Sequence, residues 1–212
     1  MPRLRPFACA LVLLGFAAAA AARPQEVVDR IAARVENDVV LLSEVRQLGA
    51  YQQFLDGKRE SDAQLLDHLI DQWIVRTEAE ASRFPRPSAA EVDRELERLA
   101  KALPPGRLLD ERLHAAGWSA AELRTIVGEQ LYLTAYLDSR FRPAVQVEPQ
   151  AIEEYYVQTL VPQAKTRGET PPPLESVREA IREILIQRGI NEQADRWLKE
   201  RRARLHVEKE IA

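Results

Sequence analysis

Apolar side chains recur at helical spacing along most of the chain, in segments that lie between clear start and stop signals. Over Asp62–Thr77, apolar residues recur every three or four positions, as on the buried side of an amphipathic helix. Pro85 and Pro87 follow and end this helix. Two Ser-x-x-Glu sequences, Ser88–Glu91 and Ser119–Glu122, have the pattern of capping boxes that open further helices. The pattern predicts a mainly helical domain.

Further helices are predicted by the same spacing and by residues that favour helix ends. Ser43 has the position of an N-cap, and Asp56-Gly57 ends that helix after about Leu55. Pro149 suits the first position of a helix, and the apolar pattern resumes after Pro173. The other expected helices cover Val92–Leu103, Leu108–Leu113, Leu123–Phe141 and Ile152–Leu160.

Strands are expected only at the two ends of the folded region. Val27–Val35 and Val39–Leu42 are runs rich in apolar residues on either side of Glu36-Asn37-Asp38, and Asn and Asp tolerate positive φ, which predicts a tight hairpin. Leu205–Ile211 has the pattern of a terminal strand. A lone hairpin is marginally stable in water, so we expect this strand to pair with it. The predicted fold class is mainly α, a multi-helix domain with a small antiparallel β-sheet formed by the N-terminal hairpin and the C-terminal strand.

The composition changes near residue 161. Pro162–Pro173 contains several prolines and few apolar residues, which predicts an exposed and partly polyproline-like linker. We therefore divide the mature chain into a helical domain over residues 23–160, a proline-rich linker over 161–173, and a C-terminal helix and strand over 174–212 that pack back on the first domain.

The first 22 residues have the pattern of a secretory signal peptide. Arg3 and Arg5 precede an uncharged run of 16 residues, Phe7–Ala22, which ends in small residues suited to cleavage. The run is shorter than the roughly 20 residues that a membrane-spanning helix needs. We expect cleavage after residue 22 and export to the periplasm, with no integral membrane span in the product.

Composition and motifs argue against several functions. The formal net charge of −3 argues against a nucleic-acid partner, and the single cysteine excludes an intramolecular disulfide framework. His68, His114 and His206 have no metal-ligand spacing, and no G-x-S-x-G sequence offers a nucleophilic serine. From the residues alone we expect no catalytic site, no metal and no cofactor.

Several short segments resemble the SurA family of periplasmic chaperones in their order and spacing. The first of them matches the family's opening strand, Asn-containing turn, second strand and Ser-Glu helix start. The segments are Val28–Val45, Leu66–Ile74, Gly117–Arg124, Phe141–Pro149 and Ile152–Tyr156. The resemblance covers roughly Val27–Tyr156 and, more loosely, Leu174–Ile211.

The resemblance implies a chaperone domain that a final helix and strand complete. Full-length relatives carry one or two parvulin-type prolyl-isomerase domains between these parts, each of which needs on the order of 90 residues. Only Val157–Pro173 occupies that place here. The resemblance therefore implies a chaperone that lacks the isomerase, and we expect no enzymatic activity.

The function that the resemblance implies is an ATP-independent periplasmic holdase that binds unfolded outer-membrane or secreted proteins. Such binding depends on weak, reversible burial of apolar surface, for which aromatic side chains between helices are suited. Each candidate for client contact is alternatively an ordinary core residue. Two other functions stay open, an adaptor or structural subunit that binds one folded periplasmic partner, and a residual prolyl isomerase. The candidates for client contact are Tyr51, Phe54, Trp118, Tyr132, Tyr155 and Tyr156.

Overall fold

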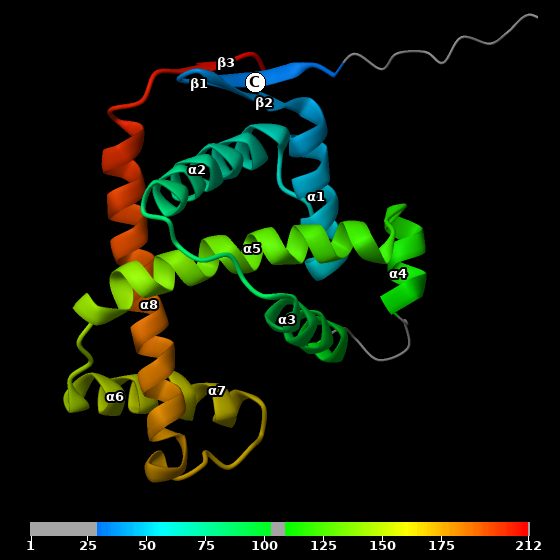
Figure 1. Cartoon of the computed structure of the whole chain (residues 1–212). Coiled ribbons are helices and arrows are strands. Elements are labelled where there is room, and N and C mark those ends of the chain that lie inside the picture. Colours follow the sequence, from blue (N-terminus) through cyan, green and yellow to red (C-terminus); the bar gives the residue numbers. More distant parts are fainter. Residues whose placement is uncertain (1–28, 103–108, 212) are drawn as a thin grey trace, which may run out of the picture.

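The computed structural model describes residues 29–102 and 109–211, which form a mainly helical fold with a three-stranded antiparallel sheet at one end (Figure 1). The predicted fold class is confirmed. The predicted signal peptide, together with Leu103 and Leu108 of the predicted helices, lies outside the described residues. The helices are α1 Leu42–Asp56, α2 Asp62–Ala81, α3 Ala89–Ala102, α4 Leu109–Ala116, α5 Ala120–Phe141, α6 Pro149–Tyr155, α7 Val161–Thr166 and α8 Leu174–Arg202.

The sheet joins the first and last described segments of the chain. Strands β1 (Ile31–Val35), β2 (Asp38–Leu41) and β3 (Val207–Lys209) lie in the order β2-β1-β3, and both pairings are antiparallel. The predicted pairing of the C-terminal strand with the hairpin is therefore confirmed. The predicted tight turn is confirmed, since Glu36-Asn37 joins the two strands, but the positive φ, 52°, falls on Glu36 rather than on Asn37 or Asp38.

Helix α1 begins earlier than the sequence predicted. Strand β2 runs directly into it, so the N-cap is Leu41 and Ser43 already lies inside the helix. The Leu41 N–H donates to a Glu44 carboxylate oxygen at 2.7 Å, which satisfies one of the free donors at the helix start. The predicted stop is confirmed, because Gly57 adopts the left-handed conformation with φ 70° and closes the helix.

Capping boxes set the starts of the other long helices that pack around α1. The Ser61, Ser88 and Ser119 hydroxyls each accept from the N–H three residues later, at 3.4, 3.3 and 3.2 Å. A Gln or Glu side chain at that third position returns a bond to the serine N–H in each case. These local bonds place the apolar stripes of α2, α3 and α5 in register with the core.

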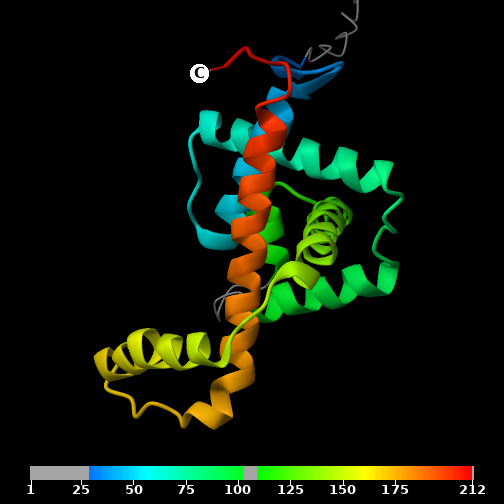
Figure 2. The same ribbon diagram turned by 90° about the vertical axis from the view of Figure 1, so that its left-hand side faces the viewer.

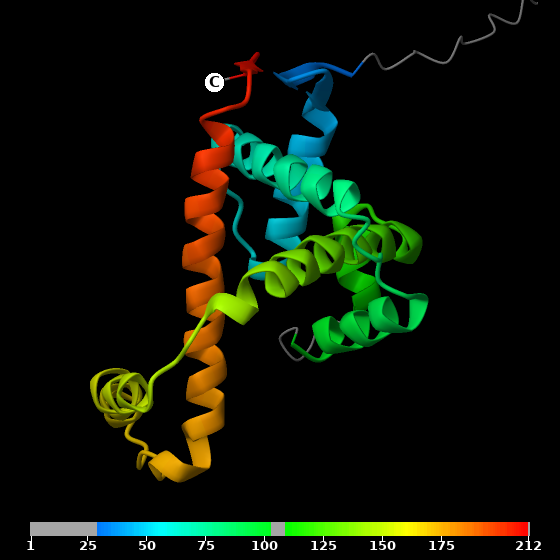
Figure 3. The ribbon, with the colours of Figure 1, turned by 60° about the vertical axis from the view of Figure 1, so that its left-hand side comes forward.

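Helix α8 runs the length of the molecule and carries the chain back to the sheet (Figures 1 and 3). Its 29 residues span about 43 Å. Near the middle of α8, a Cβ at Gly189 would lie 2.7 Å from Val145 Cγ1, so glycine permits the close approach of the connector before α6. At its C-terminal end, Trp197 and Leu198 pack against the residues of α1, α2 and the sheet.

The predicted linker is only partly a linker. Residues Val161–Thr166 form α7, which continues from α6 through a π-helical turn over Tyr156–Leu160, so the expectation of polyproline-like chain was wrong for this part. Pro162 lies directly after the π-helical turn, where the regular helical hydrogen bonds are already interrupted, so its missing N–H is accommodated there. Figure 2 shows α6 and α7 beside the N-terminal half of α8, on the side away from the sheet.

Three groups of buried side chains hold the described residues together. The first lies under the sheet and is formed by β1, β2, α1 and α2, with Leu65, Leu66 and Ile70 at 1% exposure or less. The second joins α1, α3, α4 and α5 around Phe54. The third joins α2 and α5 around Tyr132, and α8 covers it. Between these groups, α1, α2 and α5 leave an open crevice.

Candidate functional site

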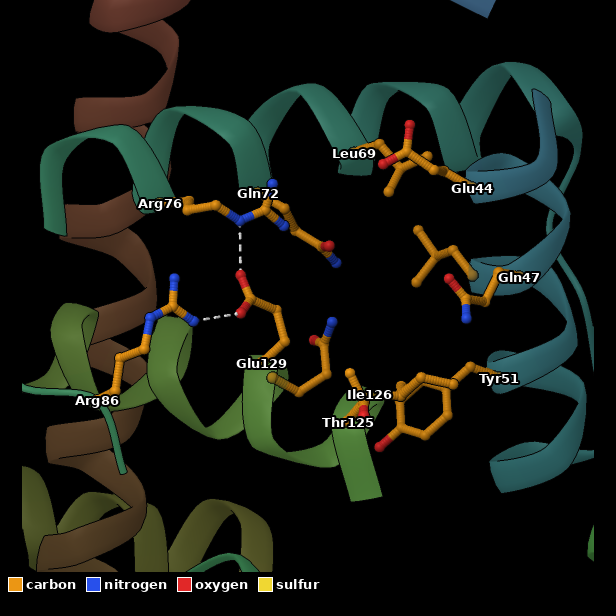
Figure 4. A pocket seen from close by; sticks show the side chains of 12 residues that line it. Glu44, Gln47, Tyr51, Leu69, Gln72, Arg76, Arg86, Thr125, Ile126 and Glu129 are labelled. Atoms are coloured by element: carbon orange, nitrogen blue, oxygen red, sulfur yellow. Dashed lines mark hydrogen bonds and ion pairs between the residues drawn. The ribbon is translucent and has the colours of Figure 1, made fainter. Parts of the chain in front are cut away.

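The crevice opens first as a cavity of about 390 Å³ between α1, α2 and α5, which we call the Arg86 cavity (Figure 4). Helical spacing supplies its walls, since residues three or four positions apart share one face of a helix. Its lining residues are Glu44, Gln47, Leu48 and Tyr51 of α1, Leu69, Gln72 and Arg76 of α2, Arg86 of the following loop, and Thr125, Ile126, Glu129 and Gln130 of α5.

A second cavity, of about 470 Å³, lies where α8 joins these three helices, and we call it the Asp195 cavity. Its apolar walls come from four helices, so it is a product of the tertiary fold rather than of any one segment. The apolar lining residues are Leu48, Leu55, Val75, Leu133, Leu137 and Leu198. The polar ones include Gln52, His68, Asp71, Thr134 and Asp195.

The two cavities adjoin. Leu48, Tyr51, Gln72 and Gln130 line both of them, and we call these four residues the waist. Among the described residues, no internal hydrogen bond engages the side-chain amides of Gln72 and Gln130. Each amide offers donors and an acceptor, and the polypeptide backbone offers both as well. The waist can therefore bond a backbone of any sequence while Leu48 and Tyr51 contact its apolar side chains.

Ion pairs lie across the Arg86 cavity. Glu129 of α5 accepts from Arg76 Nε at 2.6 Å and from Arg86 Nη1 at 2.9 Å, as the dashed lines of Figure 4 show. Burial alone raises the pKa of Glu129, but the hydrogen bonds and positive charges of the two arginines outweigh it and lower the pKa below its usual value. Glu129 is therefore ionised at neutral pH, and its two bonds fix α5 to α2 and to the loop after it.

The charge of the Asp195 cavity is different. Asp71 accepts from Arg202 Nε at 2.6 Å, yet burial dominates and raises its pKa. Asp195 of α8 is exposed, and within residues 29–102 and 109–211 no ion pair engages it. Among the described residues, no lysine or arginine lines this cavity. The cavity thus combines apolar walls and uncharged polar side chains such as Gln52 and Thr134 with the carboxylates of Asp71 and Asp195.

Three of the predicted contact residues lie together. Phe54 is 5.7 Å from Trp118 between ring centroids, and Tyr51 is 6.3 Å from Trp118. Phe54 is only 5% exposed and belongs to the core, so it does not line a groove. Tyr51 lies at the waist, and Trp118 lines a separate hollow on α1. Tyr51 is the one predicted residue that the structure places in the crevice.

The other three predicted contact residues lie elsewhere. Tyr132 is 1% exposed and its hydroxyl donates to the Phe84 carbonyl at 3.4 Å, so its prediction as a wall residue was wrong. Its apolar body fills the space between α2 and α5 instead. Tyr155 and Tyr156 lie beside α8, where Arg188 covers the first ring and the second hydroxyl donates to the Pro172 carbonyl at 2.8 Å. These two tyrosines are half-buried and outside the crevice.

The sequence reasoning missed Gln72 and Gln130, which form half of the waist. Both stand one position beside an apolar stripe, and such boundary glutamines are common on amphipathic helices. Only the packing of α2 against α5 brings them to one cavity. An unpaired amide at the edge of an apolar stripe was the sole available signal, and it is a weak one.

The described residues hold no group of His, Cys, Asp and Glu side chains arranged to hold a metal ion. None of the helices in the described part of the chain is long and apolar enough to cross a membrane. A scan against protein-family models and a search of curated proteins found no match to this chain.

Proposed function

We propose that this chain is an ATP-independent chaperone of the SurA-like type, which holds unfolded polypeptides in the crevice between α1, α2 and α5. The observation that carries the proposal is the waist. It offers free amide groups beside Leu48 and Tyr51, between two open cavities whose volumes fall in the usual range for binding sites. Such a surface binds extended chain without reading its sequence.

The energetics of this crevice suit a holdase. Apolar burial contributes about 25 cal/mol for each Å² removed from water, while the bound segment loses much conformational freedom. The lining mixes leucines with glutamines, so the apolar area available to a client is limited and each contact is weak. Weak contacts let a client leave without ATP, which a periplasmic chaperone requires.

The arrangement of the chain ends supports the same proposal. The resemblance implies a domain that a returning helix and strand complete, and here α8 and β3 return to α2 and β1. The resemblance implies isomerase domains in the position that the π-helical turn and α7 occupy here. The periplasmic location belongs to the proposal and is motivated by the predicted signal peptide.

Light scattering of a chemically denatured outer-membrane protein, diluted with and without the mature chain, tests the proposal. We expect aggregation to be suppressed at several-fold excess. Gln130→Trp fills the waist and should abolish most of the suppression, whereas the matched Gln163→Trp on exposed α7 should not. Full aggregation with the wild-type chain, or equal activity of the two variants, would contradict the proposal.

The adaptor alternative predicts a different result. A subunit that binds one folded partner should give a single stoichiometric partner in a pull-down from periplasmic extract, with no effect on aggregation. A residual isomerase should accelerate cis/trans exchange of an X-Pro peptide, which takes tens of seconds or longer without catalysis. The proposed function is binding alone, so we expect neither result.

A further inference from the structure

The two cavities of the crevice differ in charge. The Arg86 cavity holds Glu44 and Glu129 together with Arg76 and Arg86, so its lining charges balance. The Asp195 cavity holds Asp71, which Arg202 pairs, and Asp195, which no described lysine or arginine pairs; His68 also lines this cavity, whereas no lysine or arginine among the described residues does. A segment that crosses the waist therefore contacts the Arg86 cavity, whose charges balance, on one side. On the other side it contacts the Asp195 cavity, where a carboxylate is unpaired among the described residues.

The carboxylates of the Asp195 cavity are not equally available. Asp71 is paired with Arg202 at 2.6 Å, and Arg202 is shared with Asp67 at 2.8 Å. Glu60 extends the anionic rim, since it bonds Gln52 at 2.7 Å and His68 at 3.0 Å, both of which line the cavity. Asp195 is the carboxylate that no described cation engages. It stands on α8 three residues before Leu198, on the cavity side of that helix.

The apolar walls lie close to this charge. Leu137 and Leu198 line the same cavity as Asp195, so a bound side chain would contact apolar surface along its length and a carboxylate at its end. Lysine and arginine have this form, with an apolar stem and a charged head. An acidic side chain in the same place would meet Asp195 at like charge, with the neutral donors of the waist but no lysine or arginine to pair with it.

We infer that the Asp195 cavity binds lysine or arginine side chains, so that the crevice prefers unfolded segments in which a basic residue lies next to apolar ones. The inference rests on the proposed function and assigns it a substrate class. Charge complementarity within an open cavity carries it. The expected preference is modest, because Asp195 is exposed and a single exposed pair contributes little.

Isothermal titration calorimetry of the mature chain with three blocked peptides tests the inference. The peptides share a Leu-Phe-Leu centre flanked by Lys, by Gln or by Glu. We expect the Lys peptide to bind about three- to tenfold more tightly than the Glu peptide at low salt, with the Gln peptide between them. The preference should shrink at high salt, where exposed charges are screened.

The controls separate the cavity from the overall charge. The whole chain carries a formal charge of −3, which attracts any cationic peptide weakly. Asp195→Lys and Glu200→Lys change the net charge equally, and both positions are exposed on α8, but only Asp195 lines the cavity. Asp195→Lys should abolish or reverse the preference, and Glu200→Lys should retain it.

Each other outcome contradicts a stated part of the account. Equal binding of the three peptides by the wild-type chain, or an equal loss of preference in the two variants, overturns the inference and leaves the proposed function standing. If none of the three peptides binds, the inference is overturned. The proposed function has its own test, and full aggregation of the denatured client in the scattering assay would overturn it.

Discussion

Arg202 Nε lies 2.6 Å from an Asp71 carboxylate oxygen and so joins α8 to α2 across 131 residues of sequence. The same guanidinium donates from Nη1 to Asp67 at 2.8 Å, and Lys209 of β3 donates to Asp67 at the same distance. This cluster bonds α8 and β3 to α2, which lines the crevice. Helix α8 in turn provides one wall of the Asp195 cavity.

Arg202→Ala should lower the free energy of unfolding by about 1–3 kcal/mol, because it leaves two partly buried carboxylates without their shared partner. Arg182→Ala is the matched control, since its pair with Glu179 is an exposed contact within α8. That control should change stability by less than about 0.5 kcal/mol. Urea unfolding of both variants measures the difference, and equal losses would contradict this role for the cluster.

The Glu129 contacts predict how stability depends on pH. Its pKa is lowered in the folded state, so its contribution is present above the pKa of the unfolded chain and is lost as pH falls through the folded pKa. We expect the unfolding free energy to fall below about pH 5, and to fall less steeply in Glu129→Gln. Urea unfolding between pH 7 and pH 3 measures both slopes, and parallel curves would contradict the prediction.

The corrected start of α1 predicts unequal effects of two serine substitutions. Ser119→Ala removes an N-cap hydroxyl and should cost about 1 kcal/mol. Ser43→Ala lies inside α1, where the capping bond comes from Glu44, and should cost less than about 0.5 kcal/mol. Thermal unfolding followed by circular dichroism compares the stability of the two variants. A larger loss of stability for Ser43→Ala would contradict the start of α1 at Leu41 and indicate that Ser43 is the N-cap.

The contact of α6 with α8 can be tested at two neighbouring apolar residues. Ile152 is fully buried, whereas Val157 is 63% exposed. Ile152→Ala should destabilise this part of the molecule by about 2–4 kcal/mol through lost burial and a cavity, and Val157→Ala by less than about 0.5 kcal/mol. Hydrogen exchange of α6 and α8 amides measures the local effect. Unchanged protection in Ile152→Ala would mean that α6 is not packed as described.

Local signals explain how much of this fold the sequence could predict. The serines that start α3 and α5 were recognisable because a capping box acts within four residues. The pairing of β3 with β1 was also predictable, since a hairpin alone is marginal and one further strand was available. The start of α1 was not, because Leu41 has no capping side chain and its partner bond comes from Glu44. Likewise, the prolines of residues 161–173 concealed a short helix.

The candidate site was much less accessible to sequence reasoning than the fold. An aromatic residue at helical spacing can face a core or a groove. Tyr132 of α5 is buried in the core, whereas Tyr51 of α1 lines the crevice. The crevice depends on how α1, α2, α5 and α8 cross, which no local pattern encodes. Gln72 and Gln130 become a site only because those crossings bring them to a shared waist.

Site-specific photo-crosslinking shows whether unfolded chain occupies the crevice. A photoreactive residue at Gln130, inside the waist, is compared with one at Lys165, exposed on α7, during dilution of a denatured outer-membrane protein. We expect strong crosslinking of the client to position 130 and little to position 165. Equal crosslinking at both positions, or crosslinking at position 165 alone, would contradict the claim that the crevice holds unfolded chain.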